Sequence, residues 1–207
     1  MTTKHSWGAI ALCITGSTVL AGTVFTDRAM FEAALSGTAI ETFEDSPLVG
    51  TTDDGGVAMI AFDDFSVSTV PNAAKVIDVP FFGAANTTPG GSQYLYLDTD
   101  VGGVGSEATF AFNAAQSAFG FDFTDIDQAV GDVSVTIAGD SFTVPNAASQ
   151  DGFWGFIADP GEAFSSAVLT SESDSGYGID QVTFVPTPSG MAMLAALSLV
   201  SVRRRGR

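Results

Sequence analysis

Apolar residues alternate with small or polar residues along most of the chain between residues 38 and 185. Successive side chains of a strand point to opposite faces, so each alternation predicts a short β-strand with one apolar face. The clearest sets are Phe110/Phe112, Phe119/Phe121/Phe123, Val133/Val135/Ile137, Phe142/Val144, Trp154/Phe156 and Val182/Phe184. Turn clusters rich in glycine, aspartate and proline separate these sets, for example at residues 53–56, 89–91 and 174–176.

One segment before the strands has helical spacing of its apolar residues instead. Thr26 or Asp27 can cap a helix that ends near Gly37. The apolar side of this helix would consist of Met30, Phe31, Ala34 and Leu35. About ten short strands without further helices predict an all-β fold, an antiparallel, jelly-roll-like β-sandwich with one short N-terminal helix. A closed barrel is the alternative.

The N-terminal segment has the order of a secretory signal peptide. Lys4 precedes an uncharged stretch from Trp7 to Leu20, and Val19-Leu20-Ala21 offers small residues around a cleavage site. We therefore predict a signal peptide over residues 1–21 and a sandwich domain over residues 22–185. A retained membrane helix at this end is the alternative, although its apolar stretch is short for a span.

The C-terminal segment, residues 186–207, has three parts of different chemistry. Pro186-Thr187-Pro188 favours an extended chain, and an apolar stretch from Met191 to Val202 follows it. The cluster that closes the chain consists of Arg203, Arg204, Arg205 and Arg207. These arginines are expected to stay on the cytoplasmic side of a short membrane helix, which places the sandwich domain outside the cytoplasm.

This order of parts resembles the PEP-CTERM sorting signal of Gram-negative bacteria. Pro186, Thr187 and Pro188 stand where that family usually has Pro-Glu-Pro, and the apolar helix and the arginine cluster follow in the same order. The resemblance implies that an exosortase recognises the tail during a transient insertion in the inner membrane and removes it. The protein would then reach the cell surface or the extracellular matrix. A permanent C-terminal anchor is the alternative.

The body resembles the lectin-like or carbohydrate-binding-module-like sandwiches that often carry such tails. A short helix is followed in order by Glu41–Glu44, Phe119–Phe123, Phe153–Ile157 and Gly178–Val182. The resemblance implies a non-catalytic domain of the bacterial surface or matrix, with extracellular polysaccharide as a partner. A secreted carbohydrate-active enzyme of the glycosidase type and a purely structural matrix protein are the alternatives.

Charge and composition exclude several classes of partner and several kinds of catalytic and metal site. All 24 acidic residues lie between residues 22 and 185, where Arg28 and Lys75 are the two basic residues, so this segment has a formal charge of −22. Such a charge excludes nucleic acid as a partner. His5 and Cys13, each the sole residue of its type, lie in the predicted signal peptide. The predicted body therefore has no disulfide, no catalytic histidine or cysteine, and no nitrogen or sulfur ligand for zinc.

Two acidic residues stand at strand positions where the alternation predicts that the side chain points to the apolar face. Asp180 is in register with Val182 and Phe184, and Glu44 is in register with Ile40. The resemblance to carbohydrate-binding sandwiches implies a structural Ca²⁺ that joins an early strand to the last one. Glu44, Asp45 and Asp180 match those positions, and a cation would offset the cost of burying carboxylates. Solvated carboxylates at strand ends are the alternative.

Four aromatic residues at strand positions are candidates for stacking on sugar rings: Tyr94, Tyr96, Trp154 and Tyr177. Core positions or cross-strand pairs are the alternative for these rings. Two carboxylates could also act as the acid and nucleophile of a glycosidase. No pattern selects such a pair from the 24 acidic residues, so we expect a binding protein rather than an enzyme.

Overall fold

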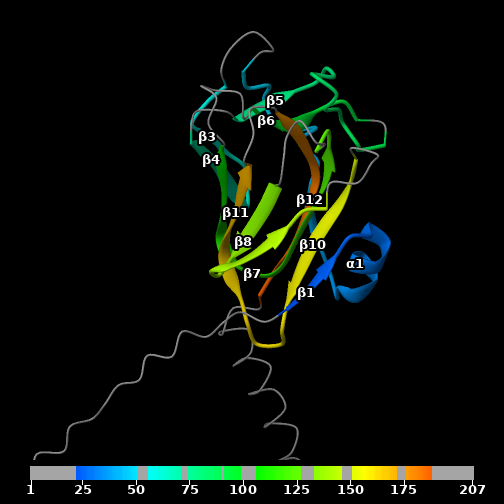
Figure 1. Ribbon diagram of the computed structural model, residues 1–207, viewed down its shortest axis with the longest axis vertical. Coiled ribbons are helices and arrows are strands. Elements are labelled where there is room, and N and C mark those ends of the chain that lie inside the picture. Colours follow the sequence, from blue (N-terminus) through cyan, green and yellow to red (C-terminus); the bar gives the residue numbers. More distant parts are fainter. Residues whose placement is uncertain are drawn as a thin grey trace, which may run out of the picture.

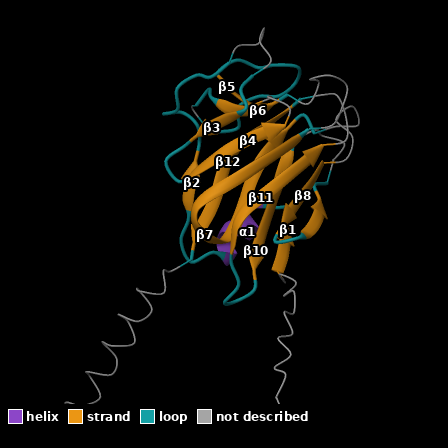
Figure 2. Cartoon of the chain, turned by 90° about the vertical axis from the view of Figure 1, so that its left-hand side faces the viewer, coloured by secondary structure: helices purple, strands orange, loops and turns teal. Residues whose placement is uncertain are grey.

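The computed structural model describes residues 22–50, 56–70, 74–89, 91–98, 106–126, 133–145, 151–171 and 176–187. Within these ranges it contains one short helix and antiparallel strands, which confirms the predicted all-β class (Figure 1, Figure 2). The elements are β1 (Gly22–Phe25), α1 (Arg28–Ala34), β2 (Ala39–Glu41), β3 (Met59–Ala61), β4 (Phe65–Val70), β5 (Ala74–Ile77), β6 (Tyr94–Leu97), β7 (Glu107–Thr124), β8 (Val133–Ile137), β9 (Asp140–Thr143), β10 (Gly152–Ala158), β11 (Phe164–Ser171) and β12 (Tyr177–Pro186).

Strand β7 is long enough to belong to both layers of the sandwich. Its first part, residues 107–112, pairs with β4 and β11, whereas residues 116–124 pair with β10 and β12, with Gln116 also opposite Phe164 of β11. Between these parts, residues 113–115 are exposed at a corner. One layer therefore has the order β3-β4-β7-β11-β8-β9, and the other has the order β5-β6-β12-β7-β10-β1, with β2 beside β12.

The alternating residues predicted for the strands form the core between the two layers. Almost all of them are buried, and Phe142 is half-buried. Aromatic rings join the layers: Phe65 of β4 lies 5.8 Å from Phe184 of β12, measured between ring centroids. The corresponding distance between Phe156 of β10 and Phe164 of β11 is 6.0 Å. Such tilted and edge-to-face pairs stabilise a core beyond the burial of their apolar area.

Helix α1 packs on the outer face of the second layer. The predicted cap is confirmed, because Met30 N donates a hydrogen bond of 2.9 Å to Asp27 Oδ1. Phe31 is buried against Phe153, and a Cβ added at Gly155 would lie 2.8 Å from its ring. The prediction that Met30 packs inward is wrong. The packed side carries Arg28, Phe31 and Leu35, so Met30 is 64% exposed.

The described chain enters through β1 and leaves through β12 at the same end of the sandwich, whereas β5 and β6 lie at the opposite end (Figure 1). Pro186 is still part of β12, and Thr187 N donates to Ala115 O at 2.8 Å. The first two residues of the proline-containing stretch thus belong to the folded body. The predicted signal peptide, Pro188 and the apolar and arginine-rich parts of the tail lie outside the described residues. No helix within the described ranges has the length and hydropathy needed to span a membrane.

Candidate functional site

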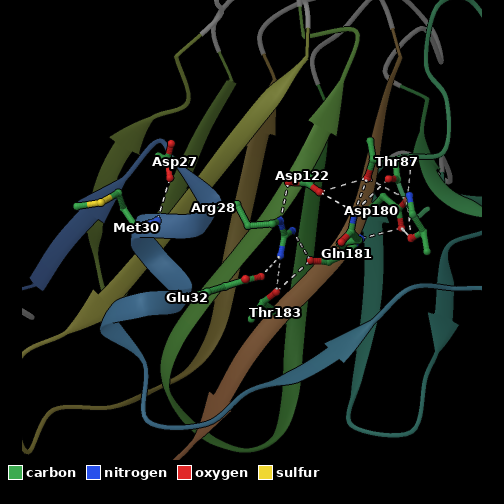
Figure 3. A network of polar contacts seen from close by, with 10 residues as sticks. Asp27, Arg28, Met30, Glu32, Thr87, Asp122, Asp180, Gln181 and Thr183 are labelled. Carbon is green, nitrogen blue, oxygen red and sulfur yellow. Dashed lines mark hydrogen bonds and ion pairs between the residues drawn. The ribbon is translucent and has the colours of Figure 1, made fainter.

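A network of polar side chains lies on the outer face of β7 and β12, beside helix α1 (Figure 3). Asp122 of β7 and Asp180 of β12 are direct partners in the strand register. Asp122 points outward because Phe121 and Phe123 on either side of it point into the core. Two carboxylates thus meet on one face of the sheet, where like charges destabilise the fold unless donors surround them.

A bulge in β12 turns Asp180 to this outer face. Gln181 has a φ of +45°, and the register with β7 shifts between Asp180 and Thr183. Ile179 and Val182 both pack in the core although they are three residues apart. The prediction from strand parity that Asp180 points to the apolar face is therefore wrong, because parity holds only along an uninterrupted strand.

Arg28 joins helix α1 to both strands through this network. Its Nε donates to Asp122 Oδ1 at 2.9 Å, and its Nη1 donates to Thr183 Oγ1 at 3.0 Å. Its Nη2 donates to the carbonyl oxygen of Gln181 at 2.8 Å. The guanidinium lies 4.8 Å from the centroid of the Phe153 ring. A planar guanidinium is suited to such a site, because it donates in several fixed directions and stacks on a ring.

Asp180 holds the connection between β5 and β6, residues 78–93, which we call the β5–β6 loop; residue 90 is outside the described ranges. Its Oδ2 accepts hydrogen bonds from the backbone N–H groups of Thr87 at 2.7 Å and Thr88 at 2.9 Å. Thr87 Oγ1 lies 3.1 Å from Asp180 Oδ2 and 3.3 Å from Asp122 Oδ2. Gln181 Nε2 donates to Asp122 Oδ2 at 2.9 Å. The network therefore fixes the middle of the loop to the sheet.

Burial raises the pKa of both carboxyl groups above the ordinary value for aspartate. For Asp122, the hydrogen bond and charge of Arg28 act in the opposite direction and lower the pKa. For Asp180, the backbone N–H groups of Thr87, Gln181 and Thr88 have this opposing effect. Desolvation is the larger cause at each site, which is typical of acids held away from water.

Glu44 holds the far end of the same loop. Its Oε1 accepts hydrogen bonds from Asn86 Nδ2 at 2.9 Å and from Gln93 N at 3.0 Å, and both of its oxygens lie 3.0 Å from Ser92 N. Gly91 lies so close to this carboxylate that a Cβ there would collide with it. Strand β2 ends at Glu41, so Glu44 lies in a turn and the parity prediction fails here as well.

The predicted calcium ligands Glu44, Asp45 and Asp180 are not brought together as a metal site. Glu44 and Asp180 reach the same loop, but N–H groups point at the oxygens that a cation would need. The positive ends of these dipoles would repel a cation, whereas they stabilise a bare carboxylate. Asp45 is exposed. Among the described residues, no group of three or more His, Cys, Asp or Glu side chains could hold a metal ion, so the residues do not fit the predicted site.

The four predicted stacking residues are in the core. Tyr94 and Trp154 have no exposed area, Tyr177 has none, and Tyr96 is 1% exposed. None of these rings can present a face to a sugar, so the alternative of core positions is correct. Tyr94 and Tyr96 are buried because of a tertiary contact. The β5–β6 loop folds back over the outer face of β6, and both rings pack in a separate cluster with Ile77, Ala84 and Phe81.

The tip of the β5–β6 loop is a tight turn that the sequence did not single out. Phe81 and Ala84 exchange two backbone hydrogen bonds of 3.0 Å, which leaves Phe82 and Gly83 as a two-residue turn. Both central residues have positive φ, +49° and +100°, as in a type I′ turn. Glycine adopts this conformation freely, whereas a left-handed Phe82 costs about 1–2 kcal/mol. A Phe-Phe-Gly stretch between two strands is the signal that could have marked it.

Phe82 is 77% exposed and is the sole aromatic side chain among the exposed large hydrophobic residues of the described chain. Rings support it from behind. Its centroid lies 4.5 Å from that of Phe81, which lies 5.0 Å from that of Tyr96. Lys75 Nζ lies 5.2 Å from the Phe81 centroid and 3.3 Å from Asp98 Oδ2. A buried cation and two packed rings thus fix the position of one exposed ring.

Comparisons with known proteins assign no family. No protein-family model matches the chain, and no curated protein matches it. Among solved structures, the chain is similar to a mutant of a family 29 carbohydrate-binding module, with 9% identity, 72% of this chain and 91% of that chain covered, and a TM-score of 0.40. It is similar to the K1 cleaved adhesin domain of Lys-gingipain from Porphyromonas gingivalis, with 12% identity, 74% and 100% covered, and a TM-score of 0.40. It is also similar to the catalytic unit of an alpha-1,3-glucanase from Streptomyces thermodiastaticus, with 13% identity, 66% and 28% covered, and a TM-score of 0.31.

Proposed function

We propose that the chain is an exported, non-catalytic protein whose sandwich binds polysaccharide through the β5–β6 loop. The observation that carries the proposal is the way this loop is held. Hairpin connections are usually roughly two to five residues long, and much longer ones are either functional or disordered. This one is fixed at its middle by Asp180 and at its end by Glu44, while its tip remains exposed. A rigid scaffold that positions a loop is a common arrangement for binding.

The geometry of Asp122 and Asp180 favours binding over hydrolysis at this site. A glycosidase needs two carboxyl groups that face its substrate. Asp180 is 1% exposed, and its Oδ2 already accepts hydrogen bonds from Thr87 and Thr88. Asp122 is committed to Arg28 and Gln181. A sugar would have to displace the loop to reach Asp180 and the guanidinium of Arg28 to reach Asp122, so the pair supports a structural role and no reaction is assigned to it.

Export and sorting are part of the proposal. The signal peptide of residues 1–21 would direct export, and an exosortase would act on the tail that begins at Pro186. The fold is compatible with display on a surface, because the chain enters and leaves the sandwich at the end opposite to β5 and β6 (Figure 1). The β5–β6 loop would then point away from a membrane that holds the tail.

Affinity electrophoresis of the full chain, purified in detergent, tests the binding function. The gels contain neutral, anionic or cationic polysaccharides, and insoluble polysaccharides are tested by sedimentation. We expect retardation by at least one polysaccharide and weaker retardation of Asp180→Asn, because the loop loses its strongest acceptor. Asp140→Asn, on strand β9, is the matched control for the loss of one charge. No retention on any member of the panel would refute the proposal, and release of reducing ends would favour the glycosidase alternative.

Mass spectrometry of the protein released by its source bacterium tests the sorting step. A C-terminus close to Pro188 is the expected result. Recovery of mature protein that still ends at Arg207 would instead mean a permanent anchor. This outcome leaves the binding function unaffected, because β12 ends at the end of the sandwich opposite to β5 and β6, which the loop connects.

A further inference from the structure

The β5–β6 loop presents one exposed ring in a fixed position, and we infer that Phe82 is the residue on which an uncharged sugar ring stacks. The inference rests on the proposed function and deepens it, because it names the contact residue and the class of polysaccharide. Phe82 is 77% exposed at the tip of the loop, and Val79, 46% exposed, precedes it by three residues. The predicted stacking residues Tyr94, Tyr96, Trp154 and Tyr177 are buried and cannot take this role.

The chemistry of an isolated exposed ring suits a pyranose. One face of such a sugar consists of C–H groups, whereas its hydroxyl groups point to the sides. The π face of phenylalanine carries partial negative charge and attracts these C–H groups, and stacking removes apolar area from water. The sugar hydroxyl groups remain free for water or for neighbouring acceptors. A single ring on a protruding turn therefore fits a repeating polymer that can be bound at many places.

Contacts of the turn hold the Phe82 ring in one conformation before a ligand binds. Gly83 packs directly on the Asp125 carboxylate, and a Cβ at Gly83 would lie 2.6 Å from Asp125 Oδ1. Phe81 braces Phe82 from behind at 4.5 Å between ring centroids. A side chain that is fixed before binding loses less conformational entropy on association. Phenylalanine also stands where asparagine is preferred, and backbone strain of this kind clusters at functional positions.

Charge selects the class of ligand. The segment from residue 22 to residue 185 has a formal charge of −22, so it repels anionic polysaccharides and anionic membranes. Asp78 is exposed near the start of the loop, and the Asp125 carboxylate lies against Gly83. Carboxylates accept hydrogen bonds from hydroxyl groups but repel other carboxylates. Anionic polysaccharides are therefore excluded, and a hydroxyl-rich neutral polysaccharide fits both the C–H face that the ring contacts and the nearby carboxylate acceptors.

Three variants of the full chain in detergent test the inference by affinity electrophoresis. The neutral probes are hydroxyethyl cellulose, laminarin and dextran, and carboxymethyl cellulose is the anionic comparator of the first. Phe82→Asn removes the ring but places a favoured residue in the turn, so the fold is retained. We expect it to weaken binding about tenfold, whereas Phe82→Tyr retains binding within about threefold. Met59→Gln is the matched control, because Met59 is 61% exposed on strand β3.

The outcomes separate the two proposals. If the wild-type chain binds no polysaccharide, the proposed function fails, and this inference fails with it. If the wild-type chain binds and Phe82→Asn binds equally well, the function stands and the role of Phe82 is refuted. Equal affinity for carboxymethyl and hydroxyethyl cellulose would refute the uncharged class. Binding to neutral or anionic lipid vesicles that is lost in Phe82→Asn, without binding to polysaccharide, would make the ring a membrane contact and overturn the inference. Circular dichroism and melting temperature verify that each variant is folded.

Discussion

Arg28 and Lys75 are the two basic residues between residues 22 and 185, and the structure uses them in different ways. Arg28 donates to four groups: the side chains of Glu32, Asp122 and Thr183 and the carbonyl oxygen of Gln181. Lys75 forms one ion pair, 3.3 Å long, with Asp98, and otherwise lies over the rings of Phe81 and Tyr96. The Arg28 site is a hydrogen-bonded network, whereas the Lys75 site is a charge packed among aromatic rings.

Both sites hold the β5–β6 loop, but at different points. The Arg28 network orders Asp122 and the bulge at Gln181, which together hold Thr87 in the middle of the loop. Lys75 braces Phe81, which supports the exposed ring at the tip. Removal of the guanidinium leaves several acceptors without a donor, whereas removal of the ammonium leaves one carboxylate without its ion pair. The two sites should therefore differ in how much they stabilise the fold.

Arg28→Met is expected to have the largest effect. The substitution leaves the Asp122 carboxylate, 15% exposed, beside Asp180 without a cation. Breaking a buried pair by removing one partner is strongly destabilising, and we expect a loss of about 3 kcal/mol in the free energy of unfolding. Urea denaturation measures this loss. Asp122→Asn in the same chain should restore part of it, because the unpaired charge is gone. A loss below about 0.5 kcal/mol would place this site among ordinary surface ion pairs.

Acidification is expected to stabilise the protein, by an amount that depends on the Arg28 site. Burial raises the pKa of Asp122 and Asp180 in the folded state, so the folded chain binds protons more tightly than the unfolded chain between the two pKa values. The free energy of unfolding therefore falls as pH rises through this range, and it rises when pH is lowered from neutral. The pKa of Glu41 is raised by burial as well and acts in the same direction.

Urea midpoints measured from neutral pH down to the ordinary aspartate pKa of about 3.9 measure this effect. The increase should be larger in Arg28→Met, because Asp122 loses the partner that lowers its pKa. The increase should be smaller in Asp122→Asn. This variant keeps the other acidic residues, so it also shows how much stability acidification adds by reducing charge repulsion over the whole protein. A stability that falls over this range, with the same slope in Asp122→Asn, would contradict the assignment.

Lys75→Met is expected to have a smaller effect than Arg28→Met, about 1 kcal/mol, because a single carboxylate loses its ion pair. Methionine fills a similar volume, and its sulfur packs favourably against aromatic rings such as Phe81 and Tyr96. Asp98, 18% exposed, is about as accessible as Asp122, 15% exposed, but Arg28→Met also leaves Asp122 beside the carboxylate of Asp180. Lys75→Ala is the informative comparison, because it leaves a cavity behind Phe81 and should cost about 2 kcal/mol or more. Equal losses in Lys75→Met and Arg28→Met would show that charge dominates at both sites.

Sequence patterns predicted the parts of the fold that depend on neighbouring residues. The alternation from Phe119 to Phe123 identified the core face of β7, and Thr26 or Asp27 was predicted as the helix cap, of which Asp27 caps the helix. These features follow from strand geometry and local hydrogen bonding. The same patterns predicted about ten strands and one helix, and the described residues contain twelve strands and one helix.

The arrangement of the candidate site could not be predicted, because it depends on features that no short stretch of the sequence reveals. The bulge at Gln181 reverses the face of Asp180, and positive φ in a glutamine is not marked by its residue type. Arg28 and Asp122 are 94 residues apart, and 24 acids were available as partners. Only the packing of α1 against Ala118 of β7 and Phe153 of β10 places Arg28 beside Asp122. Tyr94 is buried because a loop covers its strand, which is also a tertiary effect.

Calcium is expected to have the smallest effect. The calcium experiment tests whether a bound cation or the backbone N–H groups compensate the charge of the buried carboxylates. Asp180 and Glu44 each accept backbone N–H groups of the β5–β6 loop, in contrast to Asp122, which Arg28 neutralises. We expect Ca²⁺ and Mg²⁺ at equal ionic strength to raise the melting temperature equally, by screening the acidic surface. Asp180→Asn should lower the melting temperature without changing this equality. A rise specific to Ca²⁺ that Asp180→Asn abolishes would show that the ion displaces the N–H groups of Thr87 and Thr88 and completes the site first predicted from Glu44, Asp45 and Asp180.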